Sequence, residues 1–200
     1  MKKFLTVVCL LCMLLTATTA LAASVPSKTA DDLTNVEITE TETGVVADPS
    51  FAVAVVEPTE TVSAKVTEMQ EFAAEEKPVV EFFPAEVQQE IVAVLPEEAA
   101  AAELIAYELV PVSVENYDET YGDVAINFEF ATVFPEESEV IVLLGLPKAE
   151  VAEGEDPTEW IVKVGTVVEG KISILFTQEE LVRMAEGEAL MVVLGAPIAE

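Results

Sequence analysis

The sequence contains no histidine, and its two cysteines, Cys9 and Cys12, lie close to the N-terminus. Without histidine, the Ser-His-Asp and Cys-His nucleophile systems and the commonest zinc ligand are excluded. Bases are also few, with 9 Lys and Arg against 38 Asp and Glu, so the formal net charge is −29. So few bases argue against nucleic acid as a partner, because binding phosphates requires Lys and Arg. The acidic balance permits binding of cations or of a cationic partner.

Long hydrophobic runs are scarce, and the main one lies in residues 1–22, which have the pattern of a secretory signal peptide. Two lysines follow the initial Met, Phe4–Leu15 forms an apolar core, and Ala20 and Ala22 are small residues where a signal peptidase reads them. The apolar run of about 12 residues is shorter than the roughly 20 that a spanning helix needs. We therefore expect cleavage after Ala22 and export from a bacterial cell. The mature protein would be secreted or held at the cell surface, with no cysteine and no transmembrane segment.

Residues 23–78 differ in composition from the rest of the chain. They contain 12 acids against three lysines, many Thr, Val and Ala, and no Trp or Tyr. This composition is typical of an extended, self-repelling chain, and it predicts a disordered acidic spacer. Phe51–Val56 is the exception, because six consecutive apolar residues are compatible with a short strand added to a sheet edge. Glu68–Glu76 is compatible with a short helix.

Residues 79–200 have the length and pattern of one folded domain. Apolar residues recur at helical spacing from Val87 to Leu95, which predicts an amphipathic helix that begins at Pro84 and ends before Pro96. Six strands are then predicted from alternating or continuous apolar runs, at Leu104–Val114, Val124–Ala131, Val140–Leu146, Trp160–Gly165, Lys171–Phe176 and Ala189–Leu194.

Two short sequence patterns predict how the last three strands are connected. Glu169 and Gly170 predict a two-residue turn that joins the fourth and fifth strands as a hairpin. Thr177 and Glu180 have the spacing of a capping box, so a short helix is expected to begin there and to end at Gly187. This helix would carry the chain across to the last strand.

These elements predict a mainly β fold, namely a β-sandwich of about six strands with one N-terminal helix and one short crossover helix. An α+β fold with a single sheet is the alternative. The strand pattern over Leu104–Leu194 resembles the immunoglobulin-like modules of bacterial secreted proteins. The resemblance rests on strand spacing rather than on a diagnostic motif, so it implies a fold and no specific ligand.

The loop from Glu115 to Asp123 is the best candidate site, because it gathers carboxylates, an amide and two tyrosines between two strands. Aromatic rings for stacking and polar groups for sugar hydroxyls predict ligand binding by Asn116, Tyr117, Asp118 and Tyr121. Carboxylate oxygens predict calcium binding by Glu115, Asp118, Glu119 and Asp123, although the spacing differs from that of an EF-hand. The alternative is a polar turn whose tyrosines pack over the end of the fold. A second acidic loop, Glu150–Asp156, is predicted to be solvated.

From these features we expect a non-enzymatic protein with a structural, adhesive or protein-binding role. Its partner would be a protein or a cell-surface glycan, and it would need no cofactor apart from a possible calcium ion. A carbohydrate-binding or calcium-dependent module is the first alternative. A hydrolase that uses two carboxylates is the second, but a chain with 38 acids offers many such pairs, so the pattern has little specificity.

Overall fold

A computed structural model of the chain describes residues 33–75, 77–95, 100–148, 150–152 and 155–198. The predicted signal peptide, residues 1–22, lies outside the described residues. In chain order, the elements are β1 (Leu33–Thr41), β2 (Ala52–Val55), α2 (Glu60–Ala74), η2 (Val79–Phe82), α3 (Ala85–Val94), η3 (Ala101–Glu103), β3 (Ile105–Glu115), η4 (Glu119–Tyr121), β4 (Val124–Phe130), β5 (Glu139–Pro147), β6 (Thr158–Val168), β7 (Lys171–Phe176), α4 (Gln178–Glu186) and β8 (Ala189–Gly195).

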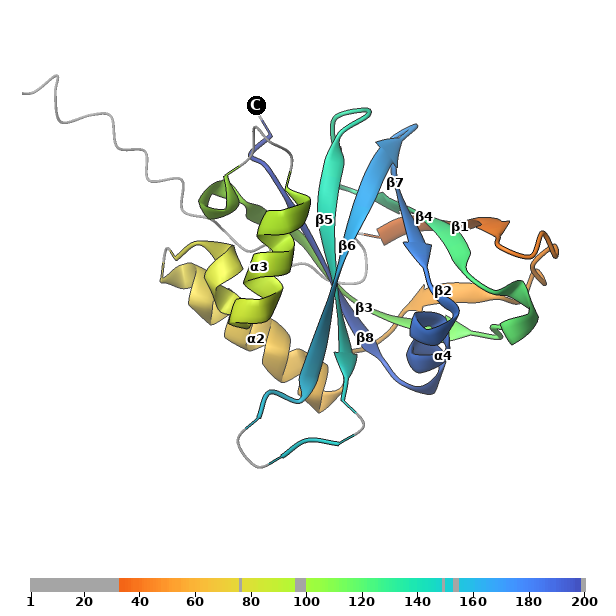
Figure 1. The fold of residues 1–200 in the computed structure, drawn as a ribbon, viewed down its shortest axis with the longest axis horizontal. Coiled ribbons are helices and arrows are strands. Elements are labelled where there is room, and N and C mark those ends of the chain that lie inside the picture. The colour runs from red at the N-terminus through yellow and green to blue at the C-terminus, as the bar shows by residue number, and fades with distance from the viewer. Residues whose placement is uncertain (1–32, 76, 96–99, 149, 153–154, 199–200) are drawn as a thin grey trace, which may run out of the picture.

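The eight described strands form one antiparallel sheet in the order β1-β4-β7-β6-β5-β8-β3-β2. The edge strands β1 and β2 lie against each other, so the sheet curls round and nearly closes on itself (Figure 1). The prediction of a mainly β fold is confirmed. The prediction of a two-sheet sandwich of six strands is wrong. Inward and outward residues alternate in the same way in a sandwich and in a curled sheet, so the alternation does not determine the order of the strands.

The local signals of residues 79–200 are confirmed. Thr177 Oγ1 accepts the backbone N–H of Glu180 at 3.3 Å, and the Glu180 carboxylate accepts the N–H of Thr177 at 2.8 Å, so α4 begins with a capping box. Glu169 and Gly170 have φ angles of 53° and 76°. Positive φ at both positions is typical of a type I′ turn, and these residues join β6 to β7 as a hairpin.

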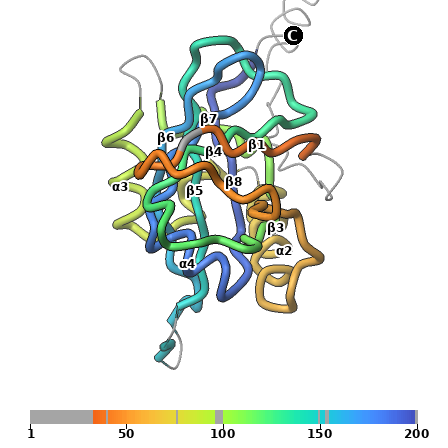
Figure 2. The backbone as a smooth tube through the Cα atoms, turned by 90° about the vertical axis from the view of Figure 1, so that its right-hand side faces the viewer, coloured from red at the N-terminus to blue at the C-terminus, as the bar shows by residue number. Residues whose placement is uncertain are grey.

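The segment 23–78, predicted to be a disordered spacer, forms part of the fold where it is described. β1 pairs with β4, and the strand expected within Phe51–Val56 is present as β2, paired with β3 at the other edge of the sheet. Figure 2 shows β1 at the front of the molecule beside β4. Val36 and Ile38 of β1 pack against the interior of the curled sheet, and Met69 of α2 is fully buried. These few apolar contacts order a segment whose composition is mostly polar.

Apolar side chains fill two layers, one inside the curled sheet and one between the sheet and helices α2 and α3. Phe128 lies in the inner layer and Trp160 in the outer layer, and both are buried. β8 faces both layers, with Met191 inward and Val192 outward. This explains why β8 is a continuous apolar run. Burial of each large apolar side chain contributes about 1.5–3 kcal/mol.

Helix α4 connects β7 to β8 and packs on the inner layer through Leu181 and Met184 (Figure 1). The Lys163 ammonium of β6 lies 2.7 Å from the Glu180 carboxylate, and the two side chains are only 12% and 8% exposed. Lys163 Nζ also donates to the carbonyl of Leu175 at 2.8 Å. This shielded ion pair fixes α4 to the sheet.

Candidate functional site

The two tyrosines of the predicted site loop, residues 115–123, pack against the connection between β1 and β2. Tyr121 is 6% exposed, and its ring stacks on Phe51 with 5.6 Å between ring centroids. Its hydroxyl accepts the N–H of Asp48 at 2.9 Å. Tyr117 is half-buried, with its ring 5.6 Å from that of Phe51 and 6.0 Å from that of Tyr121. The structure therefore brings the tyrosines together as one aromatic group with Phe51, and only Tyr117 is partly open to solvent.

The polar residues of the same loop are hydrogen-bonded within the fold. Asn116 Nδ2 donates to a backbone carbonyl of the β1–β2 connection at 2.9 Å. The Asp118 carboxylate accepts the N–H of Thr120 at 2.9 Å, and this bond holds the pKa of Asp118 below its ordinary value. Asp123 Oδ1 accepts the N–H of Gln178 at 2.9 Å, which ties the loop to α4. Each of these groups therefore has a structural task.

The four carboxylates predicted to bind calcium are not brought together. Glu115 is exposed at the end of β3, while Glu119 Oε2 accepts a hydrogen bond from Gln178 Nε2 at 3.4 Å. Asp118 and Asp123 bind backbone N–H groups, as above. Among the described residues, no group of three or more acidic side chains is arranged to hold a metal ion. The sugar-binding and calcium-binding roles of this loop stay predictions.

The electrostatics of the loop are dominated by its carboxylates. The Tyr117 hydroxyl donates to the carbonyl of Gly122 at 2.7 Å. Burial raises the pKa of the Tyr117 phenol, and the neighbouring carboxylates, led by Asp123 and Glu119, raise it further. Nearby negative charges disfavour formation of another one, so the loop is unsuited to an anionic ligand.

A groove of about 250 Å³ lies between the N-terminal end of α2 and the adjoining ends of β5, β6 and β8, and we name it the α2 groove. Two of its residues carry charge, Lys65 and Glu188, and the rest are apolar or bear hydroxyls. A Cβ at Gly145 would lie 2.8 Å from the ring of Trp160, so the close packing here requires glycine. The helix side is formed by Thr59, Thr61, Val62 and Lys65, and the sheet side by Gly145, Pro147, Pro157, Thr158, Glu188 and Leu190.

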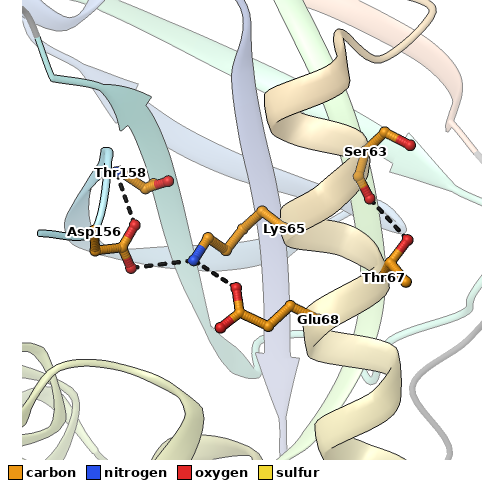
Figure 3. A network of polar contacts seen from close by, with 6 residues as sticks. All are labelled: Ser63, Lys65, Thr67, Glu68, Asp156 and Thr158. Carbon is orange, nitrogen blue, oxygen red and sulfur yellow. Dashed lines mark hydrogen bonds and ion pairs between the residues drawn. The ribbon is translucent and has the colours of Figure 1, made fainter. Parts of the chain in front are cut away.

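Lys65 spans the α2 groove from the helix to the connection between β5 and β6 (Figure 3). Its Nζ lies 2.7 Å from Glu68 Oε2 and 3.2 Å from Asp156 Oδ2, and its side chain is 12% exposed. Asp156 Oδ1 accepts the N–H of Thr158 at 2.9 Å. Burial by itself lowers the pKa of Lys65, but the bonds from Glu68 and Asp156 outweigh it and raise the pKa above its ordinary value. Lys65 therefore stays charged and holds the two sides of the groove together.

Glu188 joins the sheet side of the α2 groove to the first turn of the helix. Its Oε2 accepts the N–H of Thr59 at 2.8 Å, and Thr59 Oγ1 accepts the N–H of Val62 at 3.4 Å as the helix N-cap. Glu188 Oε1 is buried and has no hydrogen-bond partner among the described residues. An unsatisfied buried acceptor costs about 1–3 kcal/mol.

The residues of the α2 groove are not among the site residues predicted from the sequence. The helix belonged to the predicted spacer, and Asp156 to a loop predicted to be solvated. The recurrence of Val62, Val66 and Met69 at helical spacing is the signal that could have identified α2. No local pattern reveals the contact between helix and sheet, because Lys65 and Asp156 are 91 positions apart.

No similarity to known proteins indicates a function for this chain. No family model matches it, and no similar curated protein or solved structure is found. Within the part of the chain that the structure describes, no helix has both the length and the apolar character needed to cross a membrane.

Proposed function

We propose that this chain is an exported, non-catalytic module that binds another protein by holding an extended segment of it in the α2 groove. The observation that carries this proposal is the groove itself, an apolar floor with hydrogen-bonding groups along both sides. A helix and three strand ends form it, so it is largely pre-organised. Phe128, Phe176 and other large side chains fill the interior of the curled sheet, which favours binding at the surface over enclosure of a ligand.

The size of the groove favours an anchoring side chain over a whole small molecule. Pockets that enclose a drug-sized ligand measure about 300–1,000 Å³, whereas the α2 groove measures about 250 Å³. That volume accommodates one apolar side chain and the backbone beside it. Val62 and Leu190 would contact the side chain, and Glu188 and Thr158 lie where they could bind backbone groups. A buried anchor of this kind carries much of the energy of many protein interfaces.

Export is proposed from the signal-peptide pattern of residues 1–22. N-terminal sequencing of protein recovered from the culture medium is expected to begin at Ala23. Protein that stays in the cell and begins at Met1 would contradict export.

Selection from a library of random peptides tests the binding function. Thr61 is an exposed groove residue, so Thr61→Trp fills the groove without altering the core. Thr67→Trp is the matched control, because Thr67 is exposed on the same helix and points away from Lys65 (Figure 3). Peptides enriched on the wild-type protein should bind the Thr67→Trp variant equally and lose binding to the Thr61→Trp variant. Peptides that bind all three proteins alike, or no enrichment, would contradict the proposal.

A further inference from the structure

Resting on the proposed function, we infer that the segment held in the α2 groove is cationic, with one apolar anchor residue flanked by Lys or Arg. The acidic side chains around the groove carry this inference. Glu188 lines the groove, and Glu68 and Asp156 both bind Lys65 there, so three carboxylates surround a single ammonium. A basic residue beside the anchor would meet the net negative charge of these groups.

The cation of the groove is not available to an anionic partner. Lys65 is bound by both Glu68 and Asp156, so its single positive charge is already balanced by two negative ones. A second anion would have to compete with both carboxylates. The local balance of charge therefore selects for positive groups on the ligand.

The N-terminus of α2 is not available to an anion either. A helix N-terminus ordinarily favours negative groups, because its first N–H groups are unpaired and its dipole is positive there. Here Glu188 Oε2 accepts the N–H of Thr59 at 2.8 Å, and Thr59 Oγ1 accepts the N–H of Val62. The chain thus supplies its own anion at this position, and the remaining Oε1 of Glu188 is an acceptor without a hydrogen-bond partner among the described residues. The negative charge of Glu188 in the groove wall therefore favours a positive group on the ligand.

The electrostatic potential of the whole chain also favours a positively charged ligand. Its formal net charge of −29 attracts basic segments over long range and repels acidic ones. That attraction alone would bind any polycation weakly at any acidic loop. The apolar floor of the α2 groove is what would give one anchored orientation, so a test has to separate the groove from the general charge.

Three short labelled peptides separate the two contributions by fluorescence anisotropy. The first carries a central leucine flanked by lysines, the second has serine in place of the leucine, and the third has serines in place of the lysines. We expect the leucine–lysine peptide to bind the wild-type protein about tenfold more tightly than the serine-centred peptide, since one buried side chain contributes about that factor. It should bind severalfold more tightly than the leucine–serine peptide, which lacks the charged groups. The affinity of the leucine–lysine peptide should fall about tenfold in the Thr61→Trp variant, stay unchanged in the Thr67→Trp variant, and weaken with added salt.

A charge variant tests the carboxylates directly. Glu188→Gln keeps an oxygen that can accept the N–H of Thr59 but removes the charge, so it should weaken binding of the leucine–lysine peptide severalfold and leave the leucine–serine peptide unaffected. Glu71→Gln is the control, because Glu71 is an exposed residue of α2 outside the groove. Equal weakening by both variants would show attraction to the overall acidic surface and would overturn the inference.

The outcomes distinguish this inference from the proposed function. If the leucine–serine peptide binds as tightly as the leucine–lysine peptide and Thr61→Trp abolishes both, the groove binds segments but does not require charge, so only the cationic inference fails. If no peptide depends on Thr61, the proposed function fails as well. A wild-type dimer that Thr61→Trp converts to monomers would identify a second copy of this chain as the occupant and would overturn the inference.

Discussion

Phe83→Ala tests the outer layer, on which the helix side of the α2 groove rests. Phe83 is 2% exposed, and its ring meets that of Trp160 edge to face, with 5.0 Å between centroids. Replacing a buried Phe by Ala typically costs about 3–5 kcal/mol, because burial is lost and a cavity remains. For a chain of this size that loss corresponds to a fall in Tm of roughly 6–20 °C.

Urea unfolding of the Phe83→Ala variant measures this loss. Trp160 is the single Trp of the chain, so its fluorescence reports the outer layer, while circular dichroism reports the whole sheet. The two transitions should coincide, because β5 and β8 contribute side chains to both apolar layers. Val133→Ala is the control, since Val133 is 79% exposed and its truncation should change stability by less than about 0.5 kcal/mol.

Two results would refute the reasoning on the outer layer. A loss below about 1 kcal/mol would show that Phe83 is not packed as described. A fluorescence transition at lower urea concentration than the circular dichroism transition would show that the helices unfold independently of the sheet.

Three further predictions concern charged and titrating groups. Lys163→Met should lower the free energy of unfolding in urea by about 3–5 kcal/mol, because it leaves the shielded Glu180 carboxylate unpaired. A Lys163→Met/Glu180→Gln double variant should lose less stability than the sum of the two single changes. Simple additivity would contradict the ion pair. The raised pKa of Lys65 means that its bridge is fully present below the ordinary value of 10.5 and is lost as the pH rises through the folded-state value. The stability gap between the wild type and Lys65→Met should therefore hold through neutral pH and close only above about pH 10.5; a gap that closes near neutrality would refute this. Tyr117 should ionise above its ordinary pKa of 10.0, because burial and the neighbouring carboxylates both raise it, and this is seen as an absorbance phase at 295 nm that Tyr117→Phe removes. A phase at or below 10.0 would contradict both effects.

Signals that act within a few residues predicted their elements correctly. The capping box of Thr177 and Glu180, the turn at Glu169 and Gly170, and the alternation of residues 124–131 each depend on neighbours along the chain. Such patterns determine the local structure because the groups that satisfy them are close in sequence.

The strand order and the α2 groove could not be predicted in this way. β1 has a mostly polar composition, and its order comes from pairing with β4, where Leu33 lies opposite Phe130. The α2 groove likewise joins a helix near residue 60 to strand ends near residues 145, 158 and 190. In the predicted site loop, by contrast, a local pattern suggested a binding site. Its residue types suited ligand binding, but Tyr121 and Asp118 serve packing and capping in the structure.

Hydrogen exchange of the wild-type protein with and without the leucine–lysine peptide tests the α2 groove most directly as the binding site. Slowed exchange is expected on both sides of the groove, at Thr59–Lys65 of the helix side and Thr158–Trp160 of the sheet side. The loop 115–123 should be unchanged, although it is also acidic. Unchanged exchange at both sides of the groove, or slowed exchange at that loop instead, would contradict the assignment of the binding site.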